Sequence, residues 1–247
     1  MPLTRDEFYK LPKRLGVEDR LEELCANFEL YLTRFDELNP FTGPSVYFHL
    51  RTLERLRQIG LSTALEDKLF FEYLYATLAS WGMHRMGPTG AKLVEFTDFV
   101  ETLKSQKDPV ISLQNIKLTQ LTEQALQAII DKLWNILSNL RVSISETQLI
   151  AGSKTLHHLL PDLTPPIDRA HTLKFVYGYD PVYSSEEQKF KRVFPQLWKI
   201  GVRKRDIILR WMGRGFHTSE TKVIDNAIVG YVKTEMKKQT KGGRIQD

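Results

Sequence analysis

Apolar residues recur at helical spacing along most of the chain. Between residues 17 and 38, Leu21, Leu24, Phe28, Leu32 and Phe35 lie three or four positions apart, which predicts an amphipathic helix. Similar patterns predict helices over residues 45–59, 65–81, 91–103, 122–140 and 168–176. Cap-like serines and acidic residues favour two more helices, one beginning near residues 184–187 and one over residues 219–238. The sequence therefore predicts an all-α fold.

The breaks between these patterns indicate the domain organisation. Residues 107–119 lack clear periodicity, so we expect a seam between two lobes near residues 107–121. Residues 145–150 read as a short helix. The last residues, 239–247, are glycine-rich and charged, which is typical of a flexible tail. We expect one two-lobed domain spanning residues 1–247, with a cleft between the lobes.

Composition and charge limit the classes of function. The single cysteine, Cys25, excludes an internal disulfide and a thiolate metal cluster, and we expect its side chain to be buried. No apolar run approaches a membrane span, so we expect a soluble, cytoplasmic protein. We also expect a monomer. Residues 1–100 hold 12 Lys and Arg against 15 Asp and Glu, a balance of −3, which leaves +8 for the rest of a chain of net charge +5. The C-terminal part is therefore the candidate for binding a polyanion.

The segment 152–172, GSKTLHHLLPDLTPPIDRAHT, carries the densest specific chemistry. Gly152 permits a tight turn, and we expect it to open a helix with Lys154 in its first turn. Pro165 and Pro166 end that helix, and Asp168 begins the next one. The pattern thus predicts a cation and a carboxylate at two neighbouring helix N-termini.

Gly-Ser-Lys-Thr followed by Pro-Ile-Asp resembles the core of the helix-hairpin-helix DNA glycosylase superfamily. The resemblance implies an all-helical base-excision enzyme, with a helix-hairpin-helix segment at about residues 143–161. It implies that Asp168 is the essential aspartate, stabilising positive charge on the deoxyribose, and that Lys154 matches the Schiff-base lysine of members that also cleave the strand. Two features differ from the family pattern: Leu149-Ile150-Ala151 replaces the first hairpin glycine and its proline, and Lys154 and Asp168 lie 14 residues apart, about a helical turn closer than expected.

The same resemblance implies the partner and substrate. The partner is double-stranded DNA with one base flipped out of the stack, and backbone amides of the hairpin hold a phosphate. DNA contacts are expected from Gly152, Ser153, Thr155 and Arg169. Similarity to a bacterial branch linked to phage defence makes a hypermodified phage cytosine one candidate substrate, and a damaged base is the other. Neither a cofactor nor a metal is implied.

The loop 81–90, WGMHRMGPTG, is a second candidate site. Trp81 can stack on a base, and His84 and Arg85 can bind a phosphate or a sugar substituent. Tyr47 and His49, on a predicted helix, are further candidates for holding the flipped base. The structural alternative is a glycine-rich connection between helices with Trp81 in the core.

Residues 189–214 contain nine Lys and Arg, one acidic residue and several aromatics. Such a stretch favours a DNA-facing surface, with Lys191, Arg192, Arg203 and Lys204 as contacts, or alternatively a solvated helix face over a core.

Three other readings stay open. Asp168 after two prolines is a good helix N-cap in any fold. Asp162 with Glu187 and Lys189 loosely matches a metal-dependent nuclease motif, although the surroundings read as helical. A helical DNA-binding protein without catalysis would show the same charge pattern.

His157 and His158 are adjacent on a helix and point in different directions, which argues against a metal site.

Overall fold

The fold is known from a computed structural model that describes residues 16–38, 42–84, 92–178 and 184–236. In these ranges the chain is helical and forms no strand, apart from one isolated bridge between Leu93 and Ser143. The α-helices are α2 (Val17–Ala26), α3 (Phe28–Leu38), α4 (Pro44–Ile59), α5 (Leu61–Ala64), α6 (Lys68–Leu78), α7 (Phe96–Ser105), α8 (Lys107–Ile111), α9 (Glu123–Asn139), α10 (Leu149–Leu159), α11 (Lys174–Tyr177), α12 (Glu186–Arg203), α13 (Arg205–Trp211) and α14 (Glu220–Tyr231). Shorter helical turns are η1 (Ala79–Met83), η2 (Leu118–Gln120), η3 (Arg169–Leu173) and η4 (Val232–Met236). The predicted all-α class is confirmed.

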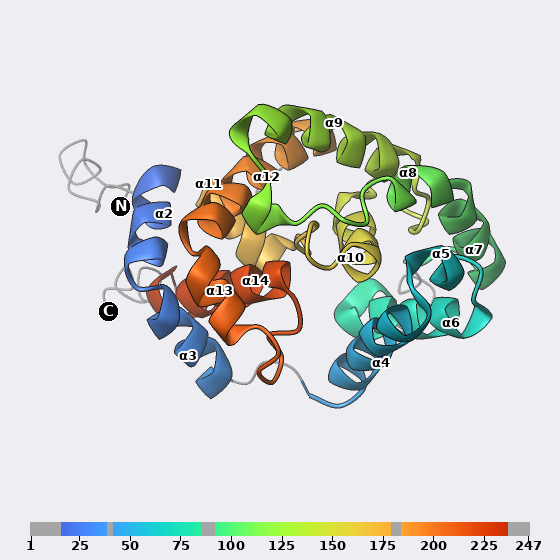
Figure 1. Ribbon diagram of the computed structural model, residues 1–247, viewed down its shortest axis with the longest axis horizontal. Helices are drawn as coiled ribbons and strands as arrows, with labels where there is room; N and C mark the ends of the chain where they lie inside the picture. Colours follow the sequence, from blue (N-terminus) through green and yellow to red (C-terminus); the bar gives the residue numbers. More distant parts are fainter. Residues whose placement is uncertain (1–15, 39–41, 85–91, 179–183, 237–247) are drawn as a thin grey trace, which may run out of the picture.

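The helices pack as two groups (Figure 1). One group surrounds α14, which contacts α2, α3, α12 and α13 and is buried along its whole length. The other contains α4, α5, α6, α7 and α8. Helix α9 runs along one edge of the molecule between the groups, and α10 lies near the centre against α4, α6 and α9. The central position of α10 explains why every residue from Ala151 to Leu159 is buried.

Some predicted element boundaries are wrong. The segment 17–38 is two helices that meet at Asn27, and residues 107–111 form α8 where we expected irregular chain. Residues 145–150 do not form the short first helix of a hairpin, since they bend into α10, which begins at Leu149. Gly152 therefore lies inside a continuous helix. The predicted tail, 239–247, lies outside the described residues.

Capping side chains fix several helix starts as the sequence predicted. Thr122, Ser185 and Ser219 each accept a hydrogen bond from a backbone N–H in the first turn of α9, α12 and α14. Ser185 and Gln188 form a reciprocal capping box. Cys25 is buried as expected, and burial raises the pKa of its thiol.

A regular series of ion pairs joins α2 and α3 to α12, α13 and the loop after α13. Lys199 binds Glu18, Arg203 binds Glu22 and Arg210 binds Glu29. His217 contacts Asp36 at 3.0 Å in the same register, and each of these four pairs spans 181 residues of sequence. The two segments therefore run alongside one another, and acids from the N-terminal part pair with three of the nine Lys and Arg residues in the basic stretch.

Within the described part of the chain, none of the helices is both long enough and apolar enough to cross a bilayer.

Helix α14 approaches α3 so closely that only glycine fits at position 230. A Cβ atom added at Gly230 would lie 2.0 Å from the carbonyl oxygen of Tyr31, whereas one at Gly152 would lie 2.9 Å from a methyl group at the end of the Leu137 side chain. We expect Gly230→Ala to lower the free energy of unfolding by about 3 kcal/mol or more, because two backbones must separate. Gly152→Ala should change it by less than about 1 kcal/mol, since Leu137 can move and alanine favours a helix. Urea unfolding of both variants tests this, and equal effects would contradict the described packing.

Candidate active site

The carboxylate of Asp168 is held at the start of η3. Its Oδ1 accepts hydrogen bonds from the backbone N–H groups of His171 at 2.6 Å and Thr172 at 3.3 Å, and its Oδ2 lies 3.0 Å from Nδ1 of His171. The side chain keeps 30% of its exposure. Burial raises its pKa, but the hydrogen bonds and charge of His171 outweigh this effect and lower the pKa from 3.8 to about 2. Asp168 is therefore both an N-cap, as the sequence predicted, and a fixed anion that solvent can reach.

Lys154 is brought to this carboxylate by a contact between its neighbours. The hydroxyl of Ser153 accepts a hydrogen bond from the backbone N–H of Ile167 at 3.1 Å, which ties α10 to the segment that precedes η3. Lys154 and Asp168 are the next residue in each segment, and their charges interact. The ammonium of Lys154 donates a hydrogen bond to the carbonyl oxygen of Trp81 at 3.3 Å. Lys154 thus interacts with Asp168, but it lies in the middle of α10 and not in the first turn of a helix, as we expected.

An ion pair on α14 lies against the indole ring of Trp81. Nζ of Lys222 is 2.5 Å from Oδ2 of Asp225, one turn further along α14, and both side chains are nearly fully buried. The ring of Trp81 faces both ammonium groups, with its centroid 5.4 Å from Nζ of Lys222 and 5.9 Å from Nζ of Lys154. Two lysines therefore face one indole, and each interacts with an aspartate, Lys222 with Asp225 and Lys154 with Asp168.

Burial changes the ionisation of these groups. It is the main cause that lowers the pKa of Lys154, and Lys222 lowers it further, whereas Asp168 and Asp225 act in the opposite direction. Burial also raises the pKa of Asp225, against the attraction of Lys222. Two carboxylates with pKa values moved apart, beside an amine whose pKa is lowered, are typical of catalytic sites.

Buried histidines link the backbone at Lys154 to helix α4. His49 of α4 bonds through Nδ1 to Nε2 of His158 at 2.9 Å and through Nε2 to the hydroxyl of Thr218 at 2.9 Å. His158 also lies 2.7 Å from the carbonyl oxygen of Lys154, and burial lowers its pKa to about 4. Both ring nitrogens of His49 have internal partners and its side chain is fully buried, so in this structure it links α4 to α10, and its contact with a flipped base stays a prediction.

Residues 152–155, which we expected to contact a phosphate, lie inside α10. The N–H of Gly152 donates to the carbonyl oxygen of Gln148 at 2.7 Å, Thr155 bonds to Ala151 within α10, and Ser153 is used against Ile167. All three residues are buried. Their positions inside a helix leave no amide pointing at solvent.

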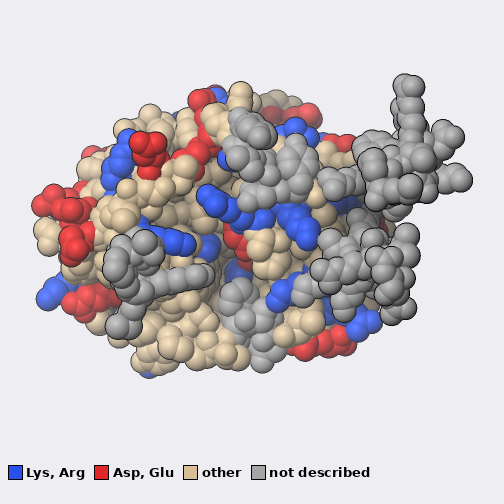
Figure 2. All heavy atoms as spheres, turned by 180° about the vertical axis from the view of Figure 1, so that it is seen from behind, with Lys and Arg blue, Asp and Glu red and all other residues tan. Residues whose placement is uncertain are grey.

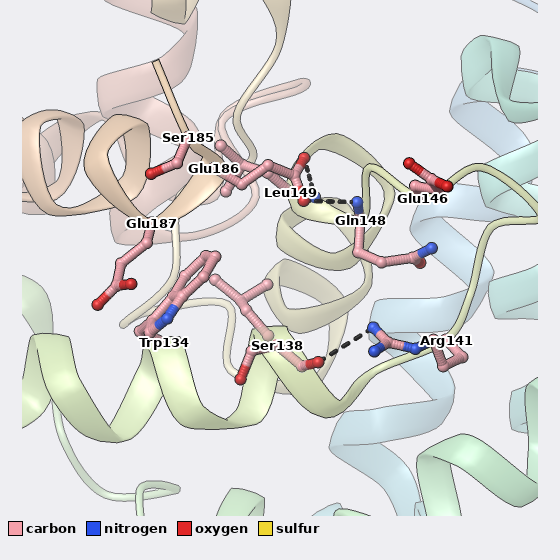
Figure 3. A pocket seen from close by; sticks show the side chains of 10 residues that line it. Trp134, Ser138, Arg141, Glu146, Gln148, Leu149, Ser185, Glu186 and Glu187 are labelled. Atoms are coloured by element: carbon pink, nitrogen blue, oxygen red, sulfur yellow. Dashed lines mark hydrogen bonds between the residues drawn. The ribbon is translucent and has the colours of Figure 1, made fainter.

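The free amides at the actual start of α10 are occupied from within the protein. Figure 3 shows the carboxylate of Glu186, in the first turn of α12, accepting hydrogen bonds from the backbone N–H of Gln148 at 2.8 Å and of Leu149 at 2.9 Å. An internal carboxylate thus fills a helix N-terminus that would otherwise attract an anion. The contact borders a pocket of about 280 Å³ between α9, α10 and α12, whose lining includes Trp134 and Arg141.

The proposed DNA-facing cations differ in their surroundings. Lys191 is paired with Asp131 and Glu187, Arg203 is paired with Glu22 through both terminal nitrogens, and Arg192 lies over the ring of Tyr177 at 4.7 Å. Arg169 is exposed beside Asp168, and Lys204 is half-buried. Figure 2 shows Lys and Arg side chains gathered around a hollow near the middle of one face, with a few acidic side chains among them.

The remaining predicted substrate contacts lie near α4 and η1. Tyr47 is 52% exposed, and Arg51 lies over its ring at 5.4 Å. His84 is exposed at the end of the described segment, and Arg85 lies outside the described residues. Trp81 is half-buried, and its indole N–H donates a hydrogen bond to the carbonyl oxygen of Ser45 at 3.0 Å. Part of the ring therefore packs inside the protein, and its stacking on a base stays a prediction.

In the described ranges, no three His, Cys, Asp or Glu side chains are arranged to hold a metal ion. Asp162 accepts a hydrogen bond from the N–H of Glu220, and Glu187 pairs with Lys191 on α12. Both lie on helices or helix connections, which is unlike the paired strands of the nuclease motif.

Sequence reasoning missed three functional candidates: His171, Lys222 and Asp225. The signal for the last two was present, because Lys222 and Asp225 are oppositely charged residues three positions apart and precede the apolar run Ala227–Val229 in the same predicted helix. His171 follows Asp168 at the spacing of a first-turn contact. Comparison with protein-family models, with curated proteins and with solved structures gave no significant match.

The anchoring of α10 by Glu186 gives a testable expectation. Glu186→Gln should lower the free energy of unfolding by about 1–2 kcal/mol, because a neutral amide offers one oxygen where the carboxylate satisfies two buried N–H groups. The adjacent Glu187→Gln is the control and should cost less than about 0.5 kcal/mol, since the pair with Lys191 is exposed. Chemical denaturation compares the two, and a larger loss in Glu187→Gln would refute the anchoring role.

Proposed function

We propose that this protein is a DNA glycosylase of the helix-hairpin-helix type, divergent in its hairpin, which excises a modified or damaged base. The observation that carries the proposal is the fixed, partly exposed carboxylate of Asp168 beside the nearly buried amine of Lys154. The two groups belong to the segment that resembles the superfamily core. On this reading the two groups of helices are the two lobes, and their seam lies near residues 107–121.

Asp168 acts as an electrostatic stabiliser. Breaking an N-glycosidic bond moves the bond electrons to the departing base and leaves positive charge on the deoxyribose, and a preorganised carboxylate beside the sugar lowers the energy of that state. A pKa of about 2 makes Asp168 a weak base at neutral pH. We therefore assign it to charge stabilisation in preference to proton abstraction.

Lys154 acts as the amine nucleophile. An amine must be uncharged to attack C1′ of the sugar, and burial lowers the pKa of Lys154 in that direction. Attack forms a carbon–nitrogen bond while the base leaves with the glycosidic electron pair. Loss of a proton from nitrogen and opening of the sugar ring then give a Schiff base.

Base recognition is assigned to the aromatic side of the site. The half-buried ring of Trp81 can stack on an extruded base, and His84, Arg85 and Tyr47 are the candidates for contacts to its substituents. The exposed Arg169 and the cations of α12 are candidates for the DNA backbone, of which Lys191 and Arg203 would first have to leave their internal partners. A hypermodified phage cytosine and a damaged base both remain within the proposal.

The first test is base release. Wild-type protein incubated with genomic and phage DNA carrying varied bases should produce abasic sites, and Asp168→Asn should reduce the rate at least about a hundredfold, because the charge is lost. Asparagine still caps a helix, so the variant should fold, which circular dichroism checks. Product formation should persist in EDTA; loss on chelation would indicate a nuclease, and binding without product would indicate a non-catalytic DNA-binding protein.

The second test is covalent trapping. Borohydride should link wild-type protein to substrate DNA, and Lys154→Met should abolish the adduct. Because only the uncharged amine reacts, the yield should rise with pH and level off below pH 10.5, the ordinary lysine value, in line with the lowered pKa. The adduct is measured by gel shift. Its absence from wild type, with base release intact, would assign a glycosylase without strand cleavage.

A further inference from the structure

Both partners of the ion pair between Lys222 and Asp225 are buried. Most pairs of lysine and aspartate lie at protein surfaces, and burial of both partners costs free energy unless the pair has further contacts. Here Nζ of Lys222 also lies 4.8 Å from the ring of Phe216 and 5.4 Å from the ring of Trp81. The pair is therefore fixed against the indole that also faces Lys154.

We propose that Lys222 and Asp225 are positioning residues whose two charges control whether the Lys154 amine is charged or free to attack. This inference rests on the proposed function and deepens it. Trp81 gives the geometry, since one ring faces both ammonium groups and the carbonyl of the same residue accepts the hydrogen bond from Lys154. Asp225 and Lys222 on α14 thus act on Lys154 electrostatically, and both ammonium groups face the ring of Trp81.

The groups that face Lys154 come from several elements. They are Asp168 before η3, Lys222 and Asp225 on α14, Lys92 before α7 and His158 on α10. Asp168 and Asp225 favour the charged amine, and Lys222 and Lys92 disfavour it. Removing the charge of Asp225 should therefore lower the pKa of Lys154, and removing the charge of Lys222 should raise it.

The experiment is a pH titration of Lys154 without DNA. Protein carrying carbon-13 lysine is followed by NMR through the Cε resonance of Lys154, which Lys154→Arg identifies. Asp225→Asn should lower the titration midpoint and Lys222→Met should raise it, each by about one pH unit, which is a tenfold change in the fraction of free amine at neutral pH. Lys222→Arg keeps the charge and should leave the midpoint close to wild type.

A double variant protects the test against misfolding. Lys222→Met with Asp225→Leu removes both buried charges, a change that proteins often tolerate. Its midpoint should lie between those of the two single variants, because the two charges act in opposite directions. The proposal is overturned if the two single variants move the midpoint in the same direction, or if neither moves it, or if the double variant falls below Asp225→Asn.

The result separates this proposal from the proposed function. The titration needs no substrate, so the predicted order of midpoints can hold in a protein that releases no base. Conversely, base release that depends on Asp168, with a Lys154 midpoint insensitive to the pair, would reject the positioning role and leave the glycosylase.

Discussion

Charges inside a protein persist only where other charges and hydrogen bonds replace the water they have lost, and this constraint organises the centre of the molecule. Lys154, Lys222 and Asp225 are nearly buried, and Asp168 is partly so. Their stability depends on one another, on the backbone N–H groups of η3 and on the ring of Trp81. Such an arrangement costs free energy, because each buried charge loses its hydration.

Helix α10 makes the arrangement possible. It lies between the two groups of helices, and it presents Lys154 toward η3 while Leu156 and Leu159 fill the core. Glu186 fixes its N-terminus, and His158 connects it to α4. An internal carboxylate thus occupies the amides at the start of α10 that would otherwise be available to an anion.

The sequence predicted the parts of the fold that depend on local pattern. Helical periodicity identified the all-α class, and the capping roles of Asp168, Ser185 and Ser219 followed from residue types at helix starts. It could not predict that Gly152 lies within a helix, because a buried glycine packed against Leu137 and a glycine that opens a helix look alike in one sequence.

Long-range pairing was equally invisible to local pattern. Three cations of the basic stretch 189–214 pair with Glu18, Glu22 and Glu29, which belong to α2 and α3 and lie 181 residues away in the sequence. The burial of His49 has the same origin, since its partners His158 and Thr218 are more than a hundred residues away. Local pattern therefore identified Asp168 and Lys154 as candidates, whereas it missed His171 in the same segment and the pair Lys222–Asp225 on α14.

The central claim is that Asp168 is an ionised carboxylate held in place beside Lys154. Its most direct measurement is the carbon-13 chemical shift of the Asp168 side-chain carboxyl as pH is lowered, assigned with Asp168→Asn. The lowered pKa predicts a resonance that stays constant from neutral pH to about pH 3, because protonation occurs near pH 2. A midpoint at or above the ordinary 3.8 would contradict the account.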